Sequence, residues 1–138
     1  MILADTGFWL ALASSSDRHH HAARRALEGL NERLITTWPV MTETCHLLAT
    51  RLGATAAVEF IKGAAGGAFQ IFSLGPDHLP RVKSLMEKYR DLPMDLADAS
   101  LVVAAEELGS GRIFSTDMRD FRSYRWKNRK PFKNLLLP

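Results

Sequence analysis

Short apolar segments alternate with amphipathic helical patterns along this chain, and that alternation limits the folds open to it. Met1–Ala4 and Arg112–Thr116 are apolar runs that each stop at an aspartate, as expected of buried strands. Asp95–Leu108 has the clearest helical spacing and ends at glycines. Strands alternating with helices predict an α/β fold, a three-layer α/β/α domain with a central, mainly parallel sheet.

The remaining segments follow the same order. Gly63–Gly67 is expected to be a break and Asp91–Pro93 a turn, while Asp120–Lys133 is expected to be irregular and basic. The other predicted strands are Leu34–Thr37, Phe69–Leu74 and a last edge strand at Asn134–Leu137. The other predicted helices are Phe8–Ala13, Arg18–Arg33, Val40–Leu52, Thr55–Lys62 and Leu79–Arg90.

Length and cysteine content limit the number of domains and the cellular compartment. A chain of 138 residues fits one domain, here residues 1–138, and its single cysteine cannot form an internal disulfide. The apolar stretch near the N-terminus is interrupted by Asp5 and Gly7, and no basic residue precedes Arg18, unlike a secretory signal. No apolar run approaches the ~18 residues of a membrane span. We therefore expect a cytoplasmic protein.

Two aspartates lie where predicted strands end. Asp5 follows the first strand and Asp117 follows the strand before the basic stretch. Parallel strands present their carboxyl ends at one edge of a sheet, so both side chains are expected there. Either residue alone could equally be a helix N-cap, for which aspartate is favoured. Two of them at one edge favour a functional site.

Two further carboxylates lie beside apolar helix faces. Asp95 is interpreted as a helix cap, whereas Asp98 precedes Leu101 by three residues and lies next to the buried stripe. Glu43 follows Val40 by three residues and leans onto the apolar face of its helix. A buried carboxylate needs a cation or hydrogen-bond donors, so the alternative for Glu43 is a partner arginine.

Four converging carboxylates favour a metal site. At ~5 Å and an effective dielectric of ~20, each pair of them repels by about 3 kcal/mol. Carboxylates and water suit Mg²⁺ or Mn²⁺, and no Cys/His cluster has zinc spacing; His19–His21 are expected to be solvated. Such a site suits phosphodiester hydrolysis. The hydroxyls expected to hold a water or ligand, with capping as the alternative, belong to Thr6, Ser115 and Thr116.

The formal net charge of +3 is unevenly distributed. From Arg112 onward there are eight Lys or Arg residues and only two Asp. A basic edge of this kind is expected to contact phosphate, the alternative being a solvated surface. Trp126 and Phe132 are equally suited to stacking on bases or to packing. The cations predicted to bind RNA are Arg125, Lys127, Arg129 and Lys130.

The acidic segments together resemble those of the PIN-domain ribonucleases, especially the VapC-like toxins of bacterial type II toxin–antitoxin modules. Each segment alone is weakly specific, but their order and spacing cover nearly the whole chain. The matching pieces are Ile2-Leu3-Ala4-Asp5-Thr6, Glu43 in a helix after a strand, Asp95-Leu96-Ala97-Asp98-Ala99, and Ser115-Thr116-Asp117-Met118-Arg119-Asp120-Phe121.

The resemblance implies a metal-dependent endoribonuclease toxin. Mg²⁺ or Mn²⁺ would be its cofactor, RNA its substrate, and a cognate antitoxin protein its inhibitor, with the toxin forming a homodimer. Ser115 and Thr6 match the family's hydroxyls, and Asp120 matches an outer acid. The quartet implied to be both catalytic and metal-binding is Asp5, Glu43, Asp98 and Asp117.

Two other functions are considered. A catalytically silent RNA-binding or antitoxin-binding module would share the fold, but the intact quartet argues against it. A phosphatase of the haloacid dehalogenase type also begins with a strand followed by Asp. Those enzymes resemble Asp-x-Asp at that point, and Gly7 occupies the second position here, which disfavours them.

Overall fold

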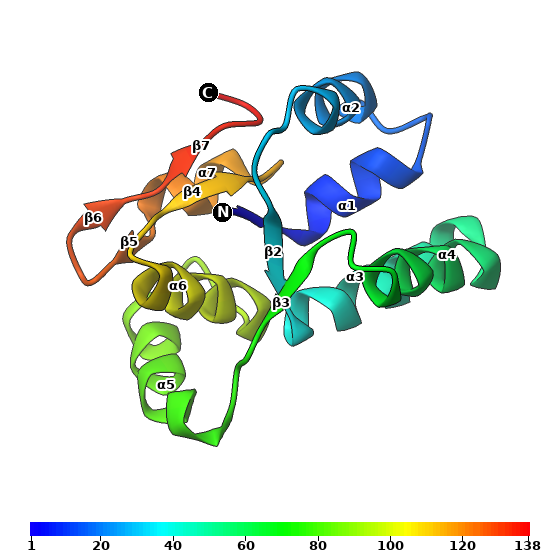
Figure 1. Cartoon of the computed structure of the whole chain (residues 1–138). Coiled ribbons are helices and arrows are strands. Elements are labelled where there is room, and N and C mark those ends of the chain that lie inside the picture. Colours follow the sequence, from blue (N-terminus) through cyan, green and yellow to red (C-terminus); the bar gives the residue numbers. More distant parts are fainter.

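Five parallel strands form the central sheet of the computed structural model, which describes residues 1–138. Their order is β3-β2-β1-β4-β7, and every neighbouring pair runs parallel. The sheet and its flanking helices confirm the predicted α/β fold (Figure 1). The strands are β1 (Ile2–Ala4), β2 (Leu34–Thr37), β3 (Gln70–Phe72), β4 (Arg112–Phe114) and β7 (Lys133–Asn134).

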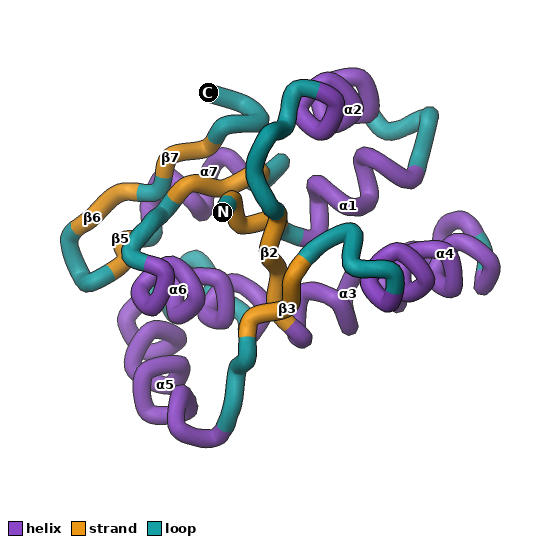
Figure 2. The backbone as a smooth tube through the Cα atoms, in the orientation of Figure 1, coloured by secondary structure: helices purple, strands orange, loops and turns teal.

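Helices cover both sides of the strands. In Figure 2, α1, α2 and α4 lie to one side of the strands, and α5 and α6 lie to the other. A helix of three residues, η1 (Pro76–His78), leads into α5. The α-helices are α1 (Thr6–Ala13), α2 (His20–Glu28), α3 (Trp38–Leu52), α4 (Ala54–Ala65), α5 (Leu79–Lys88), α6 (Leu96–Leu108) and α7 (Met118–Ser123).

Burial explains why β1 is a continuous apolar run rather than an alternating one. Ile2, Leu3 and Ala4 of β1 are all buried, because helices cover the sheet on both faces. α6 is buried along most of its length, and its small residues, among them Ala99 and Ala104, are fully buried. This helix packs against α3, α5 and β2, and thereby holds its N-terminal end near the sheet.

The sheet brings distant segments of the chain to one edge. Asp5 directly follows β1, and the segment Ser115–Asp117 directly follows its neighbour β4. Thr37 ends β2 on the other side of β1, and its hydroxyl caps α3 by accepting from the Val40 N–H at 3.4 Å. The carboxyl ends of three adjacent strands therefore meet the N-termini of helices at a single edge.

The predicted boundaries needed correction at several points. α4 continues through Gly63, and the chain breaks only at Gly66 and Gly67, where Gly67 has a φ of 81°. The predicted Arg18–Arg33 helix spans only His20–Glu28. The predicted edge strand Asn134–Leu137 is instead Lys133–Asn134. The helix is shorter because Arg18, Asn31 and Arg33 are exposed at the surface, where few contacts extend a helix.

The expectation that Asp120–Lys133 is irregular was wrong. This region contains most of α7 and an antiparallel pair, β5 (Arg125–Trp126) with β6 (Lys130–Pro131). Asp117 starts the helix as its N-cap. Lys127 and Asn128 turn the hairpin with φ values of 50° and 63°, a conformation that asparagine tolerates. Local turn chemistry thus orders a segment whose composition predicts only a basic loop.

None of the helices combines the length and the apolar character that crossing a bilayer requires.

Candidate functional site

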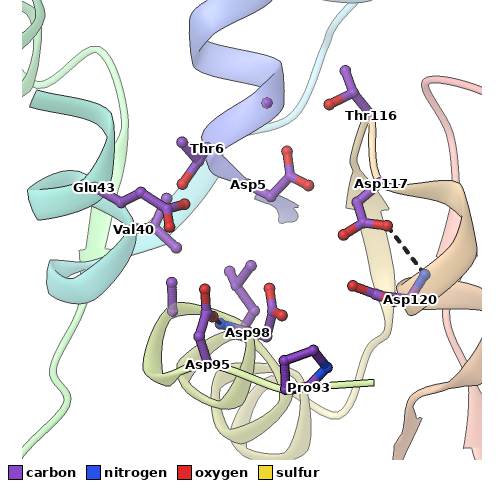
Figure 3. Close-up of a pocket in the computed structure, with 13 residues that line it drawn as sticks. Asp5, Thr6, Val40, Glu43, Pro93, Asp95, Asp98, Thr116, Asp117 and Asp120 are labelled. Carbon is purple, nitrogen blue, oxygen red and sulfur yellow. Dashed lines mark hydrogen bonds between the residues drawn. The ribbon is translucent and has the colours of Figure 1, made fainter. Parts of the chain in front are cut away.

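A cavity of about 290 Å³ opens at the carboxyl edge of the sheet. Figure 3 shows its acidic side chains approaching one space from several elements. None of its 13 lining residues is basic. The six acidic ones are Asp5, Glu43, Asp95, Asp98, Asp117 and Asp120, so all four members of the predicted quartet line a single cavity.

Asp5 is both a helix cap and a cavity residue. Its Oδ1 accepts from the Phe8 N–H at 3.0 Å, and its Oδ2 accepts from the Ser115 hydroxyl. Burial, together with the nearby charges of Asp117 and Glu43, raises the pKa of Asp5 to about 6 against the lowering effect of those donors. The cap interpretation of Asp5 is therefore confirmed, and the same side chain also lines the cavity, where its role as a site residue stays a prediction.

Asp98 is held by a residue that the sequence analysis did not identify. Its Oδ2 accepts from the Tyr124 hydroxyl at 2.8 Å. Burial and the neighbouring charge of Asp95 raise the pKa of Asp98 to about 7. Burial and the charge of Asp98 also raise the pKa of Tyr124, which keeps its hydroxyl protonated as a donor.

Asp95 caps α6, as predicted. Its Oδ1 accepts from the Asp98 N–H at 2.8 Å. The same residue also lines the cavity, which the assignment to capping alone did not anticipate. Its place one turn before Asp98 explains why its charge contributes to the raised pKa of that carboxyl.

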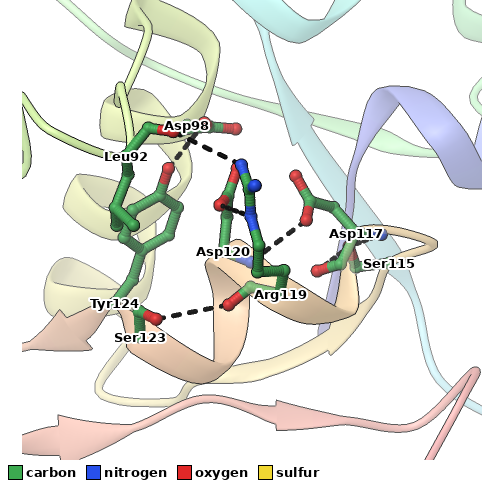
Figure 4. A network of polar contacts seen from close by, with 8 residues as sticks. All are labelled: Leu92, Asp98, Ser115, Asp117, Arg119, Asp120, Ser123 and Tyr124. Carbon is green, nitrogen blue, oxygen red and sulfur yellow. Dashed lines mark hydrogen bonds and ion pairs between the residues drawn. The ribbon is translucent and has the colours of Figure 1, made fainter.

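Asp117 and Asp120 lie at the first turn of α7. Asp117 caps the helix by accepting from the Asp120 N–H at 3.1 Å, and burial together with the Asp120 carboxyl raises its pKa. Asp120 is buried and pairs with the Arg119 guanidinium at 3.1 Å (Figure 4). Arg119 also donates to the Leu92 carbonyl at 3.3 Å, so this outer acid is tied to the loop before α6.

Glu43 is the quartet member without a partner. It is partly buried on α3 and lines the cavity from the side opposite Asp117 (Figure 3). No ion pair joins it to an arginine, so the arginine alternative is not borne out. Its carboxylate is therefore available to a ligand.

The loop after β4 is held by two side chains. The fully buried Ser115 donates to Asp5 and accepts from the Asp117 N–H at 2.9 Å. The Asn134 side chain accepts from the Ser115 N–H at 3.2 Å and donates to the Ser115 carbonyl at 2.9 Å. An amide thus continues the sheet where the backbone pairing of β7 ends. The only sequence signal for Asn134 is a polar residue in an apolar edge segment.

The two threonines lie at the wall of the cavity. Thr6 is buried at the start of α1, and Thr116 follows Ser115. A Cβ at Gly7 would lie 1.8 Å from the Thr116 hydroxyl, so only glycine allows this close approach. Gly7, whose presence in place of a second aspartate disfavours a phosphatase, is therefore required by packing at this cavity.

The aromatic residues of the basic stretch pack rather than present themselves to bases. Trp126 is buried, and its indole N–H donates to the Pro131 carbonyl at 3.1 Å. Phe132 is partly buried and meets the Phe121 ring edge-on at 5.3 Å between centroids. Of the two roles that the sequence allowed, packing is the one observed.

The four cations predicted to bind RNA differ in the contacts that their side chains make. Arg125 donates to two backbone carbonyls at the end of α7, at 2.7 and 2.9 Å. The ammonium groups of Lys130 and Lys127 lie over the Trp126 ring, at 4.8 and 5.7 Å from its centroid. Arg129 is exposed. None of the four lines the acidic cavity, so any role in binding RNA is separate from it.

The donor set at the cavity fits a hard divalent cation in its chemistry. All its charged side chains are carboxylates, and their burial and mutual repulsion raise the pKa values of Asp5, Asp98 and Asp117. No three His, Cys, Asp or Glu side chains lie close enough to form a ready ligand group. Instead, local donors hold Asp5, Asp98 and Asp117 individually.

Comparisons with known proteins agree with this architecture. The family model of the PIN domain matches residues 2–127 of this chain. Ribonuclease VapC26 of Mycobacterium tuberculosis is 27% identical over 124 residues, covering 90% of this chain and 92% of that protein. The 23S rRNA-specific endonuclease VapC20 of the same organism is 40% identical over 58 residues, 42% of this chain and 44% of that protein.

A solved structure has the same fold. The crystal structure of Mycobacterium tuberculosis VapC20, described as a sarcin-ricin loop cleaving toxin, superposes with a TM-score of 0.80. It covers 86% of this chain and 92% of that chain at 22% sequence identity. At this level of identity the likeness concerns the fold.

Proposed function

Because the chain belongs to the PIN-domain family, we propose that it is a metal-dependent endoribonuclease toxin of the VapC type, which hydrolyses RNA phosphodiester bonds. One observation carries the proposal: six carboxylates and no basic side chain line a cavity at the carboxyl edge of the sheet. Ribonuclease VapC26 is similar over 90% of the chain. We propose that residues 1–138 act as one nuclease domain in the cytoplasm.

The residues proposed to hold Mg²⁺ or Mn²⁺ are Asp5, Glu43, Asp98 and Asp117. When bound, a divalent cation supplies Lewis acidity toward the phosphodiester group. The chain itself keeps the carboxylates in place: two donors orient Asp5, and Tyr124 orients Asp98.

The hydroxyls contribute in two ways. Ser115 is engaged with Asp5, so its proposed role is to support that carboxylate. Thr6 and Thr116 line the cavity and are proposed to orient a water or a phosphate oxygen. Asp120, held by Arg119, is proposed to act as an outer acid that adds negative potential beside Asp117.

The decisive experiment measures cleavage of structured and single-stranded RNA with Mg²⁺ or Mn²⁺ and with EDTA. We expect cleavage with either metal ion and none with EDTA. RNA binding without cleavage in all three conditions would instead identify the silent binding module. Mapping the RNA ends after induction in cells then identifies the target.

The basic stretch makes a separate prediction about RNA affinity. Neutralising Arg125, Lys127, Arg129 and Lys130 to Gln is expected to flatten the dependence of log K on log salt. Each lost phosphate contact reduces the slope by about 0.7 on single strands. The measurement is RNA binding between 50 and 200 mM salt, roughly the range over which such contacts dominate.

The matched control neutralises four cations on the other side of the strands, Arg24, Arg25, Arg51 and Lys62 of α2, α3 and α4. It has the same change in net charge and is expected to leave the slope nearly unchanged. An equal slope in both variants would return the basic stretch to a solvated surface.

The remaining partners follow from the type of toxin proposed. A cognate antitoxin would hold the enzyme inactive, and the toxin would act as a homodimer. A small protein encoded directly upstream that co-purifies with this chain and suppresses RNA cleavage is the expected antitoxin. Sedimentation of the isolated chain measures its oligomeric state.

A further inference from the structure

Tyr124 is a buried side chain that ends at the acidic cavity without lining it. It follows α7 and is fully buried, yet its hydroxyl reaches Asp98 Oδ2 at 2.8 Å (Figure 4). Asp98 is its hydrogen-bond partner in the structure, and no hydrogen bond reaches the other oxygen, Oδ1. The two oxygens of this carboxylate are therefore unequal.

The ring of Tyr124 cannot easily move away from that contact. The Tyr89 ring meets it edge-on at 5.1 Å between centroids, and the Phe121 ring does so at 5.2 Å. Tyr89 has its own polar partner, because its hydroxyl accepts from the Arg125 N–H at 3.0 Å. Packing on both sides thus fixes the direction in which the Tyr124 hydroxyl donates.

We infer that Tyr124 is a positioning residue that reserves Asp98 Oδ2 and leaves Oδ1 alone to bind the divalent cation. The inference rests on the proposed metal site. A carboxylate restricted to one oxygen suits Mg²⁺, which demands near-ideal octahedral geometry. Ca²⁺ accepts bidentate carboxylates and larger coordination numbers. Tyr124 therefore acts on metal choice as well as on metal affinity.

The variant Tyr124→Phe removes only the hydroxyl and keeps the ring that packs against its neighbours. The dissociation constant of Mg²⁺, measured without RNA by competition with Mn²⁺ followed by electron paramagnetic resonance, is expected to rise about tenfold or more. The Ca²⁺ constant is expected to stay within about twofold or to fall, because Asp98 gains a second free oxygen. In Mg²⁺, kcat is expected to fall while KM for RNA stays near the wild-type value.

Tyr89→Phe is the matched control, since it removes a hydroxyl from the same aromatic cluster without touching Asp98. It is expected to lower the melting temperature, as Tyr124→Phe does, but to keep the wild-type ratio of Mg²⁺ to Ca²⁺ affinity. The ratio is a property that a loss of packing alone does not change.

Two results separate this inference from the proposed function. If wild-type protein binds the ions and Tyr124→Phe shows an unchanged Mg²⁺ to Ca²⁺ ratio, the role of Tyr124 is overturned and the metal site stands. If wild-type protein binds no divalent ion, the metal site and the inference fall together. A folded Tyr124→Phe that loses Mg²⁺ but keeps Ca²⁺ supports the role assigned to Tyr124.

Discussion

Asp98→Asn is expected to abolish RNA cleavage, by about a thousandfold or more, and to raise the melting temperature of the protein in EDTA. The loss follows because a neutral amide replaces one charged ligand of a site that is proposed to contribute several kcal/mol to the transition state. The gain in stability follows because burial and Asp95 raise the pKa of Asp98 to about 7, so its charge is unfavourable in the folded protein above that pH.

The expected rise at pH 8 is a few degrees, at about 2–4 °C per kcal/mol relieved. Asp95→Asn is the matched control, because asparagine is as good an N-cap as aspartate and the Asp98 N–H keeps its acceptor. We expect that variant to retain cleavage within about tenfold. Wild-type cleavage by Asp98→Asn, at any stability, would remove Asp98 from the catalytic quartet.

Metal affinity is expected to weaken steeply with acid, by up to about a hundredfold per pH unit below pH 6. Asp5 and Asp98 have pKa values of about 6 and about 7, both above the ordinary value of 3.8. Below pH 6 a cation must displace a proton from each, and each displaced proton costs about tenfold per unit. Titration with Mn²⁺ between pH 5 and pH 8 measures this dependence.

The raised pKa values of Asp5 and Asp98 also determine how the stability of the metal-free protein changes with pH. Because both folded-state pKa values are raised, the two protonated groups stabilise the folded protein fully below about pH 4, and this contribution is lost as pH rises through 6 and 7. In EDTA, raising the pH from 5 to 8 therefore lowers the contribution of Asp5 and Asp98 to the melting temperature. We expect Mg²⁺ to stabilise the protein more at pH 8 than at pH 5.

Asp98→Asn also serves as the control for the pH experiment. In this variant only Asp5, of the two groups with raised pKa values, still has to lose a proton. The slope of log metal affinity against pH is therefore expected to halve, to about tenfold per pH unit. A slope that is the same in both proteins would show that Asp98 releases no proton to the cation.

The site was largely predictable because its acids are tied to local signals. Asp5 and Asp117 follow strands, and Asp95 and Asp98 begin a helix with a clear apolar stripe. Such positions are set by the neighbouring residues in the chain, so spacing places these acids at the ends of strands and the start of a helix. Of the two alternatives for Asp5, the structure confirms the cap, because Oδ1 accepts from the Phe8 N–H, while the ligand role stays a prediction.

The residues that support the acids could not be found in the same way. Tyr124 lies 26 residues after Asp98, and Asn134 lies 19 after Ser115. Nothing local distinguishes Tyr124 from an ordinary packing residue, and the only local signal for Asn134 is its polarity in an apolar edge segment. Their roles exist only because α7 and β7 return to the carboxyl edge of the sheet.

By itself, the sequence determined the α/β class, the order of the elements and the carboxylates at the ends of β1 and β4, because strand and helix periodicity and capping are short-range properties. Only the tertiary structure decided which carboxylate oxygens are taken by Ser115 and Tyr124, and that Trp126 packs instead of facing RNA. Those outcomes depend on contacts between segments far apart in the chain, whose geometry is set by packing of the whole core.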